Sequence, residues 1–206
     1  MKTFNQHINE SSLNRVREAW STHDTGTITA YRDFAECGDG ERYTSKQKNV
    51  MNRFLKSKLL KRGYGVTKVK GSWFENGDTE VNEASFFVVD LKDSGNLKSD
   101  LIALGTEFDQ DAITFAEVGG DFYAVSTNEC EESWPGFGKI GKEEKLGSPK
   151  FGKTGINGFS RVNNRAFVFE GYKVVEQETL SSHTPTSIRS IMHIDDVDWR
   201  DVILKG

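Results

Sequence analysis

Residue types that would indicate a metal site or a disulfide framework are scarce in this chain of 206 residues. Cysteine occurs twice, at Cys37 and Cys130, without a Cys-x-x-Cys pair, and the four histidines are scattered, without a His-x-x-x-His spacing. Structural zinc sites use such closely spaced pairs of ligands. We therefore predict no metal and no cofactor, and we expect both cysteines to be reduced thiols of a cytosolic protein.

Long apolar runs and signatures of catalysis are also missing. No stretch approaches the roughly 18 apolar residues of a membrane-spanning helix, and residues 1–10 lack the apolar segment of a secretory signal. No Gly-x-Ser-x-Gly sequence is present to place an acyl-transfer serine. The net charge of −4 differs from the strongly basic composition of dedicated nucleic-acid-binding proteins. We predict no membrane partner and assign no catalytic residue.

The clearest strand signals fall within residues 63–127. The apolar run 86–89 predicts a strand buried on both faces. Residues 112–116 predict another strand, and a turn at 119–121 predicts a hairpin with residues 122–125. About 20 residues separate the first two strands, which is enough for a crossover helix between parallel strands.

The helix expected between these strands begins after a cap at Ser94 or Asn96. One apolar stripe marks its buried face: Leu97, Leu101, Leu104 and Phe108. Such spacings of three and four residues place side chains on one face of a helix. Gly105 is a candidate for the end of this helix before Phe108. A strand, a packed helix and a hairpin together predict a two-layer α/β sandwich.

A second, basic helix is predicted over residues 45–62, capped by Thr44 or Ser45 and closed by Gly63. Its apolar stripe consists of Val50, Met51, Phe54, Leu55 and Leu59. Lys58 falls within the apolar arc, so we expect its long side chain to reach past the core. Residues 46–70 contain nine Lys or Arg and no acid. The cations of helix 46–62 therefore predict either direct contact with nucleic acid or a solvated helix surface beside the acidic segment that follows.

The remaining elements are predicted from shorter patterns. Ser11 or Ser12 is expected to cap a helix through Trp20, and residues 26–31 to form a first strand. Residues 64–70 alternate like an edge strand. Further along the chain, strand patterns return at 166–169 and 187–194, and residues 197–204 predict a final short helix.

These signals give one α/β domain with a mixed sheet, two or three packed helices and a long Gly/Lys-rich insertion. We divide the chain into a leader or tail at residues 1–10, an α/β core at 11–129, a Gly/Lys-rich loop at 130–160, and C-terminal strands at 161–206 that complete the core. The loop is predicted because seven glycines fall between Gly136 and Gly158.

Two short patterns could carry enzyme chemistry. Residues 147–154 match the Gly-x-x-x-x-Gly-Lys-Thr pattern of phosphate-binding loops, in which Lys153 and Thr154 would contact phosphate and Mg²⁺. The match lacks its context, because a charged segment precedes it and a poor helix start follows it. Asp90 and Lys92, after an apolar strand, are typical of Mg²⁺-dependent nucleases and equally of a strand entering a turn.

Acids beside the apolar strands are the remaining candidates for a site. Glu75, Glu80 or Glu83 could join Asp90 at a metal ion in the nuclease interpretation. Alternatively, Glu75, Glu83 and Asp111 could bind a cation by themselves or pair with the Lys and Arg side chains of the basic helix. Buried carboxylates need such partners, so the second possibility is a purely structural one.

Two stretches resemble known proteins. Residues 1–4 and the triplet 8–10 resemble the leaders of T-even-like bacteriophage proteins, whose head proteins are cut after a Leu/Ile-x-Glu triplet, here after Glu10. Residues 28–118 are similar to a bacterial and phage domain family of unknown function. The second resemblance rests on Gly71, Glu75, Glu83, Ser85, Phe86, Leu104, Gly105, Phe108, Gln110, Asp111, Ala112 and Ile113. It implies a fold unit, and the first implies a phage accessory protein.

The resemblance implies a binding protein in preference to an enzyme. This binding protein, similar to the anti-DarT factor, would inhibit a host defence enzyme such as a DNA-modifying toxin. The host or toxin protein would contact aromatic and basic side chains of the 130–160 loop. These partner-binding residues are Trp134, Phe137, Lys139, Phe151 and Lys153. Such a protein would act in the host cytoplasm. Alternatives are an internal head protein carried in the virion interior, and a Mg²⁺-dependent nuclease or nucleotide-binding enzyme.

Overall fold

The computed structural model describes residues 4–33, 42–75, 79–131, 138–155, 158–162, 165–169 and 174–176. Within these residues the helices are α1 (Phe4–Thr22), α2 (Ser45–Lys61) and α3 (Leu97–Glu107). The strands are β1 (Thr25–Thr29), β2 (Gly65–Glu75), β3 (Thr79–Val89), β4 (Ala112–Ala116), β5 (Phe122–Ser126), β6 (Glu143–Gly147), β7 (Pro149–Phe151), β8 (Lys153–Gly155), β9 (Gly158–Val162), β10 (Arg165–Phe169) and β11 (Val174–Glu176). The predicted α/β class is confirmed.

Nine strands form one sheet in the order β6-β5-β4-β1-β3-β2-β9-β10-β7, and β8 pairs with β11. In its centre β3 pairs antiparallel with β1 and β2, and β1 pairs antiparallel with β4. With α2 between β1 and β2 and α3 between β3 and β4, these strands form a ferredoxin-like split β-α-β arrangement. Every pair of described neighbouring strands is antiparallel. As expected, β3 and β4 run parallel to each other, but they are not neighbours, because β1 lies between them.

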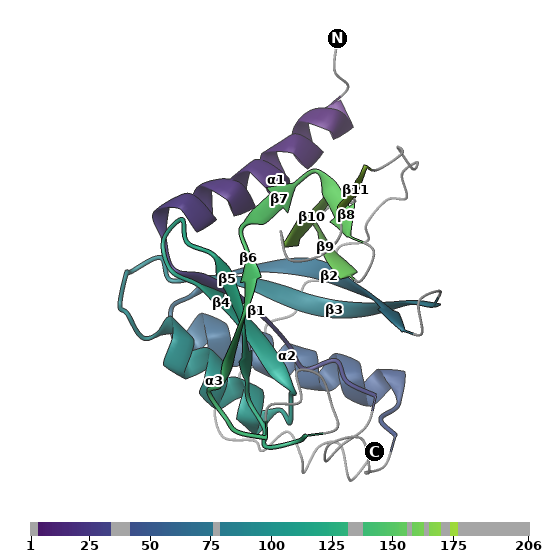
Figure 1. Ribbon diagram of the computed structural model, residues 1–206, viewed down its shortest axis with the longest axis vertical. Helices are drawn as coiled ribbons and strands as arrows, with labels where there is room; N and C mark the ends of the chain where they lie inside the picture. The colour runs from purple at the N-terminus through teal and green to yellow at the C-terminus, as the bar shows by residue number, and fades with distance from the viewer. Residues whose placement is uncertain are drawn as a thin grey trace.

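The helices lie on both faces of the sheet, α2 and α3 on one side and α1 on the other (Figure 1). The apolar run in β3 serves both layers. Phe86 and Val88 pack in the cluster formed with α2 and α3, whereas Phe87 and Val89 pack in the cluster formed with α1. This alternation follows from the two-residue period of a strand and confirms the prediction of a strand buried on both faces.

Helix α2 follows its sequence signals closely. The Thr44 hydroxyl accepts a hydrogen bond from the Gln47 N–H, and the Gln47 side chain accepts one from the Thr44 N–H, which together form a capping box. At the other end Gly63 has a φ of 89°, a left-handed conformation that glycine adopts without strain. The Nζ atom of Lys58 reaches the Glu107 carboxylate of α3 at 2.8 Å, as expected for a lysine within the apolar arc.

Helix α3 buries its predicted stripe completely: Leu97, Leu101, Leu104 and Phe108 are all 0% exposed. The prediction that Gly105 ends this helix is wrong, because α3 continues to Glu107. Gly105 has a packing role instead. A Cβ atom at this position would lie 2.5 Å from Cγ2 of Thr127, so the glycine allows α3 to approach the chain that follows β5.

Three local predictions need correction. Helix α1 begins at Phe4, well before the expected caps at Ser11 or Ser12. Strand β2 is not an edge strand, since it pairs with β3 on one side and β9 on the other. The segment 130–160 is not one long loop, because strands β6 to β9 begin within it and all except β8 join the main sheet. These strands extend the four-stranded centre at both of its edges.

The expectation of two reduced thiols is also wrong, since Cys130 is disulfide-bonded. The sequence contains one other cysteine, Cys37, which lies outside the described residues. The patterns predicted at 187–194 and 197–204 fall outside them too. In the part of the chain that the structure describes, no helix is long and apolar enough to cross a membrane.

Candidate functional site

Charged side chains gather at the two opposite ends of the central strands. One group, which we call the arginine end, lies where β1 ends and β4 begins. It consists of Tyr31, Arg32, Asp33, Lys48 and Asp111. The other group, the acidic end, lies where β1 begins and where β3 and β4 end. It consists of His23, Asp24, Asp90, Asp93 and Glu117. The arginine end contains two cations and two carboxylates, whereas the acidic end contains four carboxylates and one histidine. The arginine end is therefore the better candidate for a ligand with charges of both signs.

Asp111 is the centre of the arginine end. Its Oδ1 atom lies 3.5 Å from Nη2 of Arg32 and accepts a hydrogen bond of 2.6 Å from Nδ2 of Asn128. The Arg32 side chain is only 12% exposed, whereas that of Asp111 is 33% exposed. A guanidinium buried to this extent requires an anionic partner. The carboxylate of Asp111 is therefore the more open member of this ion pair.

Lys48 forms the second ion pair of the arginine end. Its Nζ atom contacts Oδ1 of Asp33 and lies 4.7 Å from the centre of the Tyr31 ring. The Lys48 side chain is 11% exposed and that of Asp33 is 44% exposed. Lys48 stands in the first turn of α2, where its N–H donates to the Thr44 carbonyl. The capping box fixes this lysine within the first turn of α2, and the hydrogen bond of 2.7 Å from the Tyr43 N–H to the Asp33 carbonyl ties the start of α2 to the chain that leaves β1.

Asn52 connects α2 to the strands that lead into the arginine end. Its Oδ1 atom accepts a hydrogen bond of 2.8 Å from the N–H of Ala30, and its Nδ2 atom donates one of 2.6 Å to the Ala84 carbonyl. The Thr29 hydroxyl donates to the same carbonyl at 3.0 Å. Asn52 is 6% exposed. Because both ends of its amide are used, the residue fixes where β1 ends relative to β3.

The arginine end combines two largely buried cations, two partly exposed carboxylates and an aromatic ring. A ligand that carries both a carboxylate and a positive charge matches this set. Arginine and lysine bind carboxylates through charge-assisted hydrogen bonds, and carboxylates and aromatic faces attract cations. Every charge of the set already has a protein partner, so a ligand would share these partners or exchange with them.

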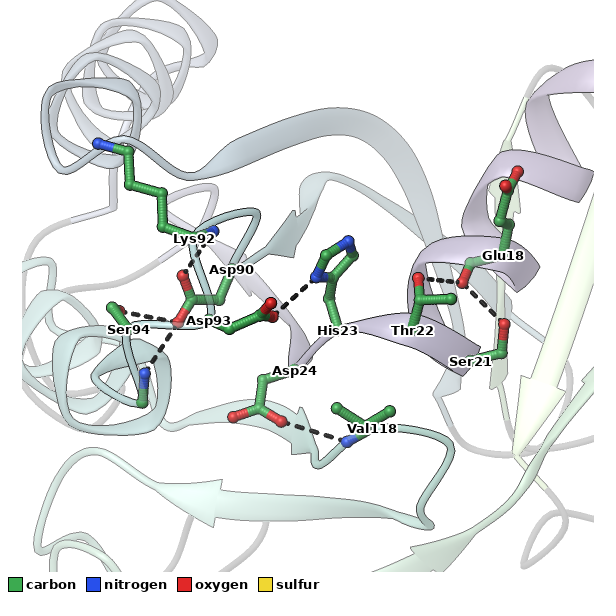
Figure 2. A network of polar contacts seen from close by, with 11 residues as sticks. Glu18, Ser21, Thr22, His23, Asp24, Asp90, Lys92, Asp93, Ser94 and Val118 are labelled. Carbon is green, nitrogen blue, oxygen red and sulfur yellow. Dashed lines mark hydrogen bonds and ion pairs between the residues drawn. The ribbon is translucent and has the colours of Figure 1, made fainter.

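The acidic end is a network of turns (Figure 2). The Asp90 carboxylate accepts hydrogen bonds from the Ser94 hydroxyl at 2.8 Å and the Gly95 N–H at 3.1 Å. Nδ1 of His23 lies 2.8 Å from the Asp93 carboxylate, and Asp24 accepts a hydrogen bond from the Val118 N–H at 3.2 Å. These contacts tie the α1–β1 junction to the turns that follow β3 and β4.

The charge of the acidic end is dominated by carboxylates. Burial raises the pKa of Asp24 above its usual 3.8, the Val118 N–H lowers it, and the carboxylates of Glu117, Asp90 and Asp93 raise it further. No group of three His, Cys, Asp or Glu among the described residues could hold a metal ion. What the structure shows of Asp90 is its hydrogen bonds within the turn that follows β3, which are those of the structural alternative for the Asp90 and Lys92 pattern.

The phosphate-loop pattern at residues 147–154 does not form a phosphate loop. Its residues belong to the end of β6, to β7 and to the start of β8, with a left-handed turn at Gly152. A phosphate loop requires a helix directly after the glycine-rich turn, so that its N-terminal N–H groups face the phosphate. Here a strand follows the turn, and the predicted nucleotide site lacks its geometry.

The structure describes three of the five predicted partner-binding residues. Trp134 and Phe137 lie outside the described residues. Lys139 is exposed in the turn before β6, and Lys153 begins β8. Phe151 is partly buried, with its ring centre 6.0 Å from those of both Trp20 and Phe167. Its contacts are those of a packing residue.

Among the predicted acids, the structure places Asp111 at the arginine end, where Arg32 and Asn128 contact it. Glu83 lies on β3, two residues before Ser85, the register partner of Thr29 in β1. Sequence reasoning missed Arg32, Asp33 and Lys48. For Arg32 and Asp33 the available signal was their place directly after the predicted strand 26–31, because ligand-binding side chains often stand where a strand ends. Lys48 was one of several cations of the basic helix and had no signal of its own.

Comparison with known proteins gives the chain a family. A model of the S-adenosylmethionine lyase family matches residues 35–178. The chain belongs to the S-adenosylmethionine lyase family. The matched segment runs from before α2 to beyond β11 and includes Lys48 and Asp111, whereas Arg32 and Asp33 directly precede it.

One solved structure, "Phage SAM lyase in complex with S-methyl-5'-thioadenosine", is similar to the chain. It is 18% identical, with 52% of this chain and 90% of that chain covered and a TM-score of 0.31. No curated protein matches the sequence. The family match corrects the resemblance drawn from the sequence. The domain does not belong to a family of unknown function, and the protein is not an anti-DarT factor.

Proposed function

We propose that this protein is a lyase that cleaves S-adenosylmethionine (SAM). The observation that carries the proposal is the family match over residues 35–178, which covers well over half of the chain. It replaces the hypothesis of a toxin inhibitor, and with it the alternatives of an internal head protein, a nuclease or a nucleotide-binding enzyme. We place the substrate at the arginine end, because its charged groups complement those of SAM.

The charges of SAM match the arginine end group by group. SAM carries a carboxylate, an α-ammonium group and a sulfonium cation. In our assignment Arg32 and Lys48 bind the carboxylate, because both cations are largely buried and hold their positions. The more exposed carboxylates of Asp33 and Asp111 attract the two positive groups. The Tyr31 ring, already 4.7 Å from an ammonium group, provides a face for a cation or for adenine.

A lyase cleaves SAM without adding water, and the sulfonium is the leaving group. When the bond between sulfur and methionine Cγ breaks, sulfur keeps the electron pair and methylthioadenosine is released. Two routes balance the atoms. The substrate's own carboxylate can attack Cγ, which closes a homoserine lactone, or a base can remove a proton from Cβ, which leaves vinylglycine. A bound carboxylate close to Cγ favours the first route, because positioning a nucleophile within the same molecule lowers the barrier strongly.

The purified protein should convert SAM to methylthioadenosine, measured by liquid chromatography and mass spectrometry. The four-carbon products are isomers, so SAM with two deuterium atoms on Cβ separates the routes: the lactone keeps both, and vinylglycine loses one. Unchanged SAM after long incubation with folded protein would refute the proposal.

A matched pair of variants tests the location of the site. Arg32→Gln should lower kcat/KM for SAM by tenfold or more, since a charged hydrogen bond contributes about 1.5–3 kcal/mol. Arg53→Gln removes the same charge from the exposed face of α2 and should leave the rate unchanged. Equal rates for wild type and Arg32→Gln would move the site away from the arginine end while leaving the lyase proposal intact.

In cells we propose that the protein acts in the cytoplasm of a bacterial host during phage infection. Loss of SAM would deprive host enzymes that need it, including restriction systems. The protein would thus still act against host defence, by destroying a substrate instead of by binding a defence enzyme. Expression in bacteria should lower the SAM pool and raise methylthioadenosine. An unchanged pool in cells that contain active enzyme would contradict this role.

A further inference from the structure

A second charged surface, outside the arginine end, lies over α2 and β2. Five exposed cations form it, and we call it the basic face: Lys46, Arg53 and Lys56 on α2, and Lys68 and Lys70 on β2. The basic residues of α2 that approach the core are paired, Lys48 with Asp33 and Lys58 with Glu107. The members of the basic face form no ion pair within the described part of the chain.

The strand register places the two β2 lysines on the same side of the sheet as α2. Lys68 is opposite Phe86 and Lys70 is opposite Ala84 on β3. Residues directly opposite each other in a sheet share a face, and Phe86 packs in the cluster that includes α2. Figure 1 shows α2 running beneath β2 and β3. The helix and the strand therefore present their cations on one side of the molecule.

The spacing within the basic face suits a regular row of negative charges. Lys46 and Arg53 are about 10 Å apart along the axis of α2, from a rise of 1.5 Å per residue. Lys68 and Lys70 are about 7 Å apart along their strand. No Asp or Glu occurs between Arg42 and Phe74, although the whole chain has a net charge of −4. The segment that carries these cations therefore contains no acidic residue of its own, whereas the remainder of the chain is acidic.

We propose that the basic face binds the phosphate backbone of duplex nucleic acid, independently of SAM cleavage. A duplex fits this surface better than a single strand, because single strands are bound by stacking their bases on exposed aromatic rings. Among the side chains whose exposure the structure describes, the large apolar ones that are exposed are Leu60, Leu91, Val118 and Ile140, and none of these is aromatic. Contacts of this kind carry no sequence information, so the binding is non-specific.

Fluorescence anisotropy with a labelled 20-base-pair DNA duplex tests the proposal. With three to five phosphate contacts, log K should fall against log salt with a slope of about −3 to −4.5, and Kd should lie at about 1–100 μM near physiological salt. A single-stranded probe of equal length should bind more weakly. Absence of duplex binding at 20 mM salt, or binding to vesicles of anionic lipid without binding to the duplex, would overturn the proposal.

Double variants of equal charge identify the surface. Arg53→Gln with Lys56→Gln, and separately Lys68→Gln with Lys70→Gln, should each raise Kd at least tenfold and reduce the salt slope by about 2. Arg15→Gln with Lys142→Gln removes two exposed cations elsewhere and should leave the slope nearly unchanged. An equal loss in all three would refute the basic face. SAM turnover, measured in the same samples, should be unaffected, which separates this test from that of the lyase.

Discussion

Arg32, on the chain that leaves β1, and Asp111, on the chain that enters β4, meet with Nη2 and Oδ1 3.5 Å apart. The contact follows from topology. β1 and β4 are antiparallel neighbours, so the end of the first and the beginning of the second lie at the same end of the sheet. A pair far apart in sequence thus becomes the centre of the candidate site.

Asp111→Asn should weaken SAM binding. The substitution keeps the shape of the side chain and removes the charge that attracts the substrate's positive groups. We expect KM for SAM to rise about tenfold, from the 1.5–3 kcal/mol typical of a charged hydrogen bond, with a smaller change in kcat. Asp109→Asn is the matched control, since Asp109 has a φ of 53°, a conformation that asparagine tolerates well. If both variants raise KM equally, the effect is not specific to the site.

Asn52→Leu should destabilise the fold. The substitution leaves the N–H of Ala30 without the acceptor that Asn52 provides, while the Ala84 carbonyl keeps only the hydrogen bond from the Thr29 hydroxyl among its side-chain donors. An unsatisfied buried polar group destabilises by about 1–3 kcal/mol, so the free energy of unfolding in urea should fall by about 2 kcal/mol or more. Asn49→Leu on the exposed side of the same helix should change it by less than about 0.5 kcal/mol. Equal values for the two variants would show that Asn52 does not join α2 to the strands.

The fold could be predicted wherever local pattern and tertiary role agree. Residues 86–89 are apolar on both sides of the strand because helices cover both faces of β3. The boundaries of α2 follow from Thr44, Gln47 and Gly63, whose capping roles need only neighbouring residues. These signals depend on short stretches of chain, so they can be recognised without knowing where the other helices and strands lie.

The other strands and the candidate site depend on partners that are remote in sequence. In β6 the residues Glu143, Glu144 and Lys145 are exposed, so no apolar alternation marks it, and its hydrogen bonds to β5 define it as a strand. The arginine end likewise has no motif, because its members come from separate elements. The sequence contained Asp111 as a candidate, but its actual partner Arg32 becomes visible only through the sheet order.

Gly105→Ala should destabilise the protein, although alanine favours helices by about 1 kcal/mol over glycine. The new Cβ atom would lie 2.5 Å from Cγ2 of Thr127. Thr127 is 0% exposed, and its hydroxyl donates to the Gln110 carbonyl, so it has little freedom to move. Overpacking of this kind destabilises by about 1–3 kcal/mol, measurable by urea unfolding. Ser99→Ala, on the exposed side of α3, should be near neutral; a stabilised Gly105→Ala would show that the contact yields.

Asp24→Asn should stabilise the protein at neutral pH. Burial and the neighbouring carboxylates keep the pKa of Asp24 above its usual 3.8, so the fold favours the protonated form. The contribution of this group to stability is therefore complete below the unfolded pKa and is lost as pH rises through the higher folded pKa. Asparagine has no charge to bury, and its Oδ1 can still accept the hydrogen bond from Val118 N–H. The melting temperature of the variant should be higher than that of wild type at pH 7 and equal to it at pH 3. A lower Tm for Asp24→Asn at pH 7 would show that the carboxylate charge itself stabilises the acidic end.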